Sequence, residues 1–155
     1  MSAQRAFRQQ PALRNERSGL RVSPGLWHMI VGTGVDIMET SRLEEALQKH
    51  GERFANRVCT PAEIAYCKRF KNWAGRFAAR FAAKEAAFKA LGTGWSHGVR
   101  WVDVEITHAP SGKPELTLRG QAEEIARQMG VVRTAVSISH AGRFVVAQVI
   151  FESDG

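Results

Sequence analysis

The most constraining feature of the sequence is an alanine- and phenylalanine-rich segment at residues 73–91. It contains no proline, and Gly92 and Gly94 follow it as a stop signal, so it predicts one long helix. At roughly 100° per residue, its phenylalanines share one stripe and its alanines cover the opposite side. A helix that is apolar nearly all round is buried on most faces, so the other elements must pack around it.

The flanking segments predict shorter helices and antiparallel strands. Before the central helix, we expect a strand at 30–37, a helix at 41–50 ended by Gly51, and a helix at 61–70 that opens with a capping box at 60–63. After it, we expect a hairpin of strands 99–107 and 115–118, a helix at 121–129, and a hairpin of strands 134–139 and 144–151. This order indicates an α+β fold with a largely antiparallel sheet packed on the long helix.

Length and charge distribution predict one domain behind a basic extension. A chain of 155 residues suits a single core. Residues 1–28 lack hydrophobic periodicity and hold five arginines against one glutamate, which is +4 of the formal +7 and leaves +3 for the rest. We expect residues 29–155 to form the functional domain. Residues 1–28 are interpreted as the result of a start chosen upstream of Met29, as a disordered tail, or as an organelle-targeting segment.

Composition excludes several classes of protein. The modest charge of residues 29–155 suits an anionic small molecule or an acidic protein partner, and no nucleic-acid-binding motif is present. No apolar stretch is long enough to cross a bilayer. Cys59 and Cys67 have neither Cys-x-x-Cys spacing nor histidines at ligand spacing. They are interpreted as reduced, packed thiols, which favours a cytoplasmic location.

Two carboxylates occupy positions that the hydrophobic pattern predicts to be largely buried. Asp36 ends an apolar strand behind Gly32 and Gly34, which allow another backbone or a ligand to approach closely; a turn or helix-cap aspartate is the alternative. Glu85 lies on the buried helix one turn before Lys89, so it binds a metal, takes up a proton, or forms an ordinary ion pair. Two carboxylates beside basic side chains match the way proteins hold Mg²⁺ with substrate phosphates, whereas zinc lacks its preferred ligands.

A row of cations at i, i+4 spacing follows the same helix, formed by Arg76, Arg80 and Lys84. These side chains repel one another unless an anion lies beside them, and a phosphate is the natural candidate. Near the C-terminus, Ser139 and His140 are adjacent on a predicted strand and so point to opposite faces, which argues against a serine nucleophile. His140 is interpreted as a phosphate or metal-site contact, with a turn histidine as the alternative.

Taken in order, these segments resemble holo-acyl-carrier-protein synthases of the 4′-phosphopantetheinyl transferase family. The resemblance rests on GTGVDI at 32–37 with Glu39 and Arg42, RFAAKEA at 80–86, KALGTG at 89–94, GKP at 112–114 and SISH at 137–140. One such motif is weak evidence, but five in order across residues 29–152 are specific. The departure is the extension: family members begin near the position of Met29, which favours the upstream-start interpretation.

The resemblance implies a phosphopantetheinyl-transferase-like fold that assembles as a homotrimer, with coenzyme A between adjacent subunits. It implies that Asp36 and Glu85 bind Mg²⁺ and that Lys89 lies near the diphosphate. The other positions that it implies are Arg80, Lys84, Gly92, Lys113, Pro114 and His140 for coenzyme A, and Arg42, Arg53 and Arg57, extended by Lys68 and Arg69, for docking of acyl carrier protein.

The implied reaction is attack by a serine hydroxyl of apo-acyl carrier protein on the β-phosphate of coenzyme A. It releases adenosine 3′,5′-bisphosphate and supports the biosynthesis of fatty acids or related acyl chains. Glu85 and Lys89 are the implied catalytic residues, and the proton acceptor is either Glu85 through a metal-bound water or a base from solvent. The alternative is a non-catalytic module that binds coenzyme A or carrier protein. The sequence leaves open which carrier protein is modified and whether acyl-coenzyme A is accepted.

Overall fold

The computed structural model describes residues 28–155, so the predicted extension lies outside the described residues except for His28. The elements in chain order are β1 (His28–Glu39), α1 (Thr40–Val58), α2 (Pro61–Lys68), α3 (Trp73–Leu91), the 3₁₀ helix η1 (Trp101–Asp103), β2 (Val104–His108), β3 (Pro114–Leu118), α4 (Gly120–Gln128), β4 (Val131–Ala141) and β5 (Phe144–Asp154). This order confirms the predicted α+β class.

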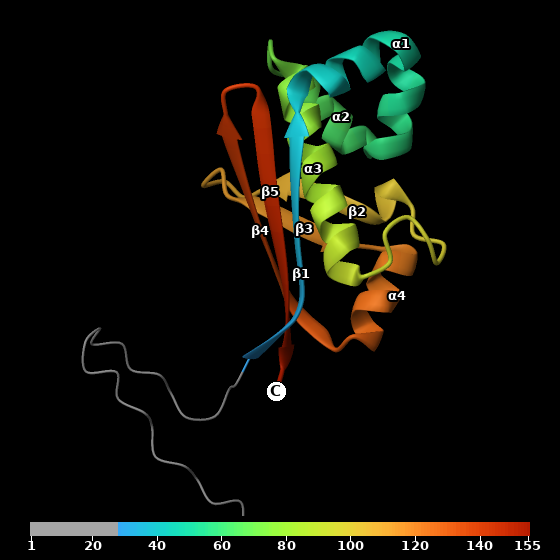
Figure 1. Ribbon diagram of the computed structural model, residues 1–155, viewed down its shortest axis with the longest axis vertical. Helices are drawn as coiled ribbons and strands as arrows, with labels where there is room; N and C mark the ends of the chain where they lie inside the picture. The colour runs from blue at the N-terminus through green and yellow to red at the C-terminus, as the bar shows by residue number, and fades with distance from the viewer. Residues whose placement is uncertain (1–27) are drawn as a thin grey trace, which may run out of the picture.

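Three long strands form the main sheet, in the order β1-β5-β4, with both neighbouring pairs antiparallel. The strands β2 and β3 form a separate antiparallel hairpin. In Figure 1, α3 lies along the sheet, α1 and α2 lie beside one end of the sheet, and α4 lies near its other end. Asp36 of β1 pairs with Ala147 of β5. It lies close to the end of β1 at Glu39, where the chain enters α1.

The core is built around α3, as its composition predicts. Most of its alanines are fully buried, and Phe77 and Phe88 are buried beside them. Because alanine side chains are small, β1 and β5 can both pack closely on this helix. None of the helices between residues 28 and 155 has the combination of length and hydrophobicity needed to span a bilayer.

The first helical segment of α1 stops at Gly51, as predicted, because Gly51 has the non-helical angles φ 57° and ψ −144°; the sequence did not predict the second helical segment that follows it within α1. The strand predicted from residue 99 begins only at Val104. The Asp103 carboxylate accepts a hydrogen bond from the Arg100 backbone N–H at 3.0 Å, and this local bond closes the turn of η1 in place of strand pairing.

Both cysteines are packed in the interior, as expected. Cys59 and Cys67 are buried and are not joined to each other by a disulfide. Burial raises the pKa of both thiols, and the charge of Glu63 raises them further. A raised thiol pKa disfavours the reactive thiolate, so these residues serve packing.

Candidate active site

The site begins where β1 crosses α3 at backbone contact distance. A Cβ atom added at Gly34 would collide with the carbonyl oxygen of Ala86, and one added at Gly32 would collide with that of Ala90. Only glycine therefore permits this approach, and of the two expected neighbours, another backbone or a ligand, the structure places a backbone here. Residues two apart on a strand share a face, so Asp36 points to the same side as Gly34, toward α3.

Lys89 of α3 joins the two elements at this crossing. Its ammonium donates hydrogen bonds to Asp36 Oδ1 at 3.1 Å and to the carbonyl oxygen of Val35 at 2.8 Å. The second carboxylate oxygen of Asp36 is buried and has no hydrogen-bond partner within residues 28–155. A buried carboxylate oxygen without a donor is costly, so this position suits an added cation.

Glu85 lies one helical turn before Lys89 on the same face of α3. Burial raises the pKa of Glu85, and the negative charge of Asp36 raises it further; a hydrogen bond from the Trp95 side chain and the charge of Lys89 act in the opposite direction. The two carboxylates are therefore close enough to repel. A divalent cation bound by oxygen ligands would relieve this repulsion and engage the unpartnered Asp36 oxygen, so the donor set fits Mg²⁺.

Trp95 is not among the residues that the sequence predicts for this site. It follows Gly92 and Gly94, which both have positive φ and let the chain turn back beside α3. A tryptophan in a glycine-rich turn directly after the helix that carries the acid is the signal that points to it. Trp95 is 62% exposed.

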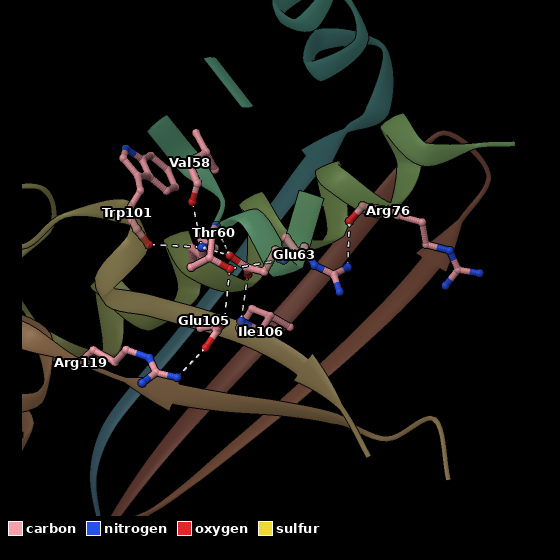
Figure 2. Close-up of polar contacts among 10 residues, drawn as sticks. Val58, Thr60, Glu63, Arg76, Trp101, Glu105, Ile106 and Arg119 are labelled. Carbon is pink, nitrogen blue, oxygen red and sulfur yellow. Dashed lines mark hydrogen bonds and ion pairs between the residues drawn. The ribbon is translucent and has the colours of Figure 1, made fainter. Parts of the chain in front are cut away.

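Lys84 does not face this site, although the resemblance implied that it contacts coenzyme A. Its ammonium is fully buried and donates to Glu63 Oε2 at 2.7 Å, to the carbonyl oxygen of Val58 at 2.8 Å and to that of Trp101 at 3.3 Å. Figure 2 shows Glu63 at the centre of this network, where it also accepts from the backbone N–H groups of Thr60 and Ile106. An ammonium has three donors, and all three are used, so we remove Lys84 from the coenzyme A residues.

Two arginines of the same row lie over aromatic rings instead of beside an anion. The guanidinium of Arg80 lies 4.4 Å from the centre of the Tyr66 ring, and that of Arg76 lies 4.3 Å from the Phe70 ring. His108 stacks on Tyr66 at 4.9 Å, and burial, followed by the charges of the two arginines, lowers the His108 pKa. Arg80 is buried, and its Nε has no hydrogen-bond partner in the described residues.

The other positions implied for coenzyme A lie away from the crossing of β1 and α3. His140 on β4 lines a hollow of about 340 Å³ together with Phe70, Lys71, Asn72, Gly75 and Arg76. Lys113 and Pro114 lie where the β2–β3 turn enters β3. Arg80 precedes Glu85 by five residues, which turns its side chain by about 140° around α3. One chain therefore does not gather the implied coenzyme A residues in one place: Lys89 and Gly92 lie at the end of α3, whereas His140 lines a hollow on β4.

The positions implied for docking lie on the surface of α1 and just beyond. Arg42, Arg53 and Arg57 are exposed. Arg53 and Arg57 are one turn apart in the part of α1 that follows Gly51, so they share a face. None of these three arginines forms an ion pair with a residue between 28 and 155, whereas Lys68 pairs with Glu52.

The molecule is thus an α+β domain in which two acidic side chains and a lysine meet where a strand crosses a buried helix. A family model for the 4′-phosphopantetheinyl transferase superfamily matches residues 32–149. The chain is 50% identical over 125 residues to the holo-[acyl-carrier-protein] synthase of Solibacter usitatus, an alignment that covers 81% of the chain and 100% of that protein. It is 48% identical over 124 residues to that of Koribacter versatilis, with 80% and 99% covered.

Solved structures give the same result. A crystal structure of holo-[acyl-carrier-protein] synthase from Neisseria meningitidis superposes with a TM-score of 0.75 at 34% identity and covers 81% of this chain and 100% of that one. The Helicobacter pylori protein in complex with coenzyme A superposes with a TM-score of 0.68 at 30% identity and covers 77% and 98%. The chain belongs to the 4′-phosphopantetheinyl transferase superfamily, which confirms the resemblance and the expected fold.

Proposed function

We propose that this chain is a magnesium-dependent holo-acyl-carrier-protein synthase, which transfers the phosphopantetheine arm of coenzyme A to a serine of apo-acyl carrier protein. The observation that carries the proposal is the meeting of Asp36, Glu85 and Lys89 at the crossing of β1 and α3, where one Asp36 oxygen has no partner in the described residues. The names of the similar proteins support it, since they are holo-acyl-carrier-protein synthases and one was solved with coenzyme A.

In this proposal, Asp36 and Glu85 hold Mg²⁺, which when bound would neutralise charge on the diphosphate of coenzyme A and on the leaving phosphate. Lys89 is half exposed, so its ammonium can reach a phosphate oxygen from its place beside Asp36. The chain contributes positioning and electrostatic stabilisation, because the nucleophile is the carrier serine. Arg42, Arg53 and Arg57 offer an exposed basic surface for an acidic carrier protein, which speeds association and sets its orientation.

We further propose that the chain works as a homotrimer whose sites are completed across subunits. The separation of Lys89 and Gly92 from His140 within one chain supports this, because a site completed by a second subunit would bring both sets of residues to one ligand. The outer face of the main sheet also supports it: Val35 and Ile37 of β1 are 56% and 62% exposed on the side away from α3. Apolar side chains on an open sheet face suit contact with a second copy.

Light scattering behind size exclusion tests the assembly. We expect a particle of three times the 17.2 kDa chain mass. Ile37→Asp should shift it toward monomer and reduce transfer, because it introduces a charge into the contact, while Ile37→Val should leave it a trimer. A parent protein that runs as a monomer at assay concentration and is fully active would contradict the proposal.

Mass spectrometry of the carrier protein tests the activity. Incubating the chain with apo-acyl carrier protein, coenzyme A and Mg²⁺ should add one phosphopantetheine arm to the carrier and release adenosine 3′,5′-bisphosphate. Excess chelator should stop the addition, and a carrier with alanine at the acceptor serine should remain unmodified. If coenzyme A binds and the carrier is never modified under these conditions, the chain is instead a non-catalytic binding module.

Two narrower assignments accompany the proposal. We assign the transferase domain to residues 29–155, which include all of the segment matched by the family model. We also propose a cytoplasmic location, supported by Cys59 and Cys67, which are buried and not joined to each other. Buried unpaired thiols are typical of proteins that fold in a reducing compartment.

A further inference from the structure

We propose that a hollow bordered by α1, α2 and the start of α3 receives one apolar side chain from the acidic surface of the carrier protein. The inference rests on the proposed function and adds an apolar anchor to its basic docking surface. The hollow measures about 440 Å³, within the range of clefts that bind ligands. It is lined by Leu47, Gly51, Glu52, Ala55, Asn56, Ile64, Lys68 and Trp73.

The bend of α1 at Gly51 lets both segments of this helix border the hollow. Leu47 comes from the segment before the bend and Ala55 from the segment after it, and Ile64 of α2 lies with them. A Cβ atom added at Gly51 would meet nothing within 4 Å, so this side of the bend is open space. Glycine is needed here for its positive φ, because no neighbouring atom approaches it closely.

The surface inside the hollow is mainly apolar. Leu47 and Ala55 are buried and form its floor, whereas Ile64 and Trp73 are half-buried and leave part of their side chains uncovered. The Trp73 ring meets that of Phe77 edge to face, with centres 6.5 Å apart, which supports it against the buried face of α3. An apolar surface on a supported wall gains free energy when a partner covers it, so the hollow suits an anchor side chain.

The charges beside the hollow favour an acidic partner. Lys68 pairs with Glu52 at 2.5 Å, so the two charged lining residues compensate each other. Arg53 directly follows Glu52 in the chain, and it is exposed. Arg57 directly follows Asn56, so both arginines lie next to the rim of the hollow, and neither forms an ion pair with a residue between 28 and 155.

This arrangement assigns different tasks to the arginines and the hollow. Exposed charges at the rim of an interface attract and orient a partner of opposite charge, and salt screens this attraction. A buried apolar anchor instead slows dissociation, and its contribution depends little on salt. The occupant that fits both is an apolar side chain flanked by carboxylates, which an acidic carrier protein would present.

Filling the hollow tests the inference. Asn56 is exposed at the rim, so Asn56→Trp can place its indole in the hollow without disturbing the core. We expect the affinity for a carrier protein with alanine at its acceptor serine, measured by calorimetry, to fall about tenfold at both low and high salt. The double variant Arg53→Ala with Arg57→Ala should also bind more weakly, with a loss that shrinks at high salt.

Gln48→Trp is the matched control, since it makes the same change at an exposed position of α1 that does not line the hollow. It should bind the carrier like the parent, and so should Asn56→Ala, which leaves the hollow open. If Asn56→Trp loses no more affinity than Gln48→Trp while the parent still transfers the arm, the anchor is wrong and the proposed function stands. If the parent neither binds nor modifies the carrier, both are wrong.

Discussion

Lys84→Met is expected to lower the free energy of unfolding by about 3–5 kcal/mol, because it leaves the buried Glu63 carboxylate without its cation. For a domain of this size, roughly 2–4 °C per kcal/mol converts this into a fall in thermal midpoint of on the order of 10 °C. The reason is the position of the ion pair. It joins the ends of α1 and α2 to α3 and to the turn at Trp101, so all of these elements share the loss.

Thermal denaturation of three variants checks this account. The double variant Lys84→Met with Glu63→Gln should recover part of the loss, because no charge remains buried and glutamine can still accept a hydrogen bond. Arg127→Met removes an exposed ion pair with Glu124 and should leave the midpoint near that of the parent. A Lys84→Met protein of parental stability with weakened coenzyme A binding would instead restore Lys84 as a ligand contact.

Local signals predicted much of the fold because they act within a few residues. The helix α3 spans the predicted residues, Trp73 to Leu91, and Gly92 ends it in the left-handed conformation that only glycine adopts easily. The capping box at the start of α2 is present, with Thr60 and Glu63 bonded to each other's backbone N–H groups. The sequence also predicted the close approach at Gly34, since a glycine inside a strand often marks a place where another backbone or a ligand comes close.

Long-range pairing explains what the sequence did not predict. The row formed by Arg76, Arg80 and Lys84 predicted an anion beside these positive charges, with a phosphate as the candidate. The anion beside Lys84 is instead the Glu63 carboxylate, 21 residues away in another helix. Tyr66 and His108 lie beside Arg80 because of how α2 and β2 pack, which no local pattern reveals. The position of Trp95 is set by the turn after α3, in which Gly92, Gly94 and Gly98 have positive φ, and by contact with the Trp101 ring.

The metal pair itself is the central claim. Asp36 and Glu85 come from elements about 50 residues apart, and the crossing of β1 and α3 brings them near enough for their charges to interact. If both hold the cation that stabilises charge on the transferred phosphate, removing either charge weakens a contribution of several kcal/mol to the reaction. At 1.36 kcal/mol for each factor of ten, the rate should fall by about 10³-fold or more.

The most direct test is the rate of phosphopantetheine transfer by Asp36→Asn and Glu85→Gln at saturating coenzyme A and Mg²⁺, with circular dichroism to establish that each variant is folded. Each substitution keeps the size of the side chain and removes its charge, so we predict folded proteins with a rate at least about 10³-fold below that of the parent. A folded variant of either kind that transfers the arm at close to the parental rate would contradict the metal pair, and with it the proposed mechanism.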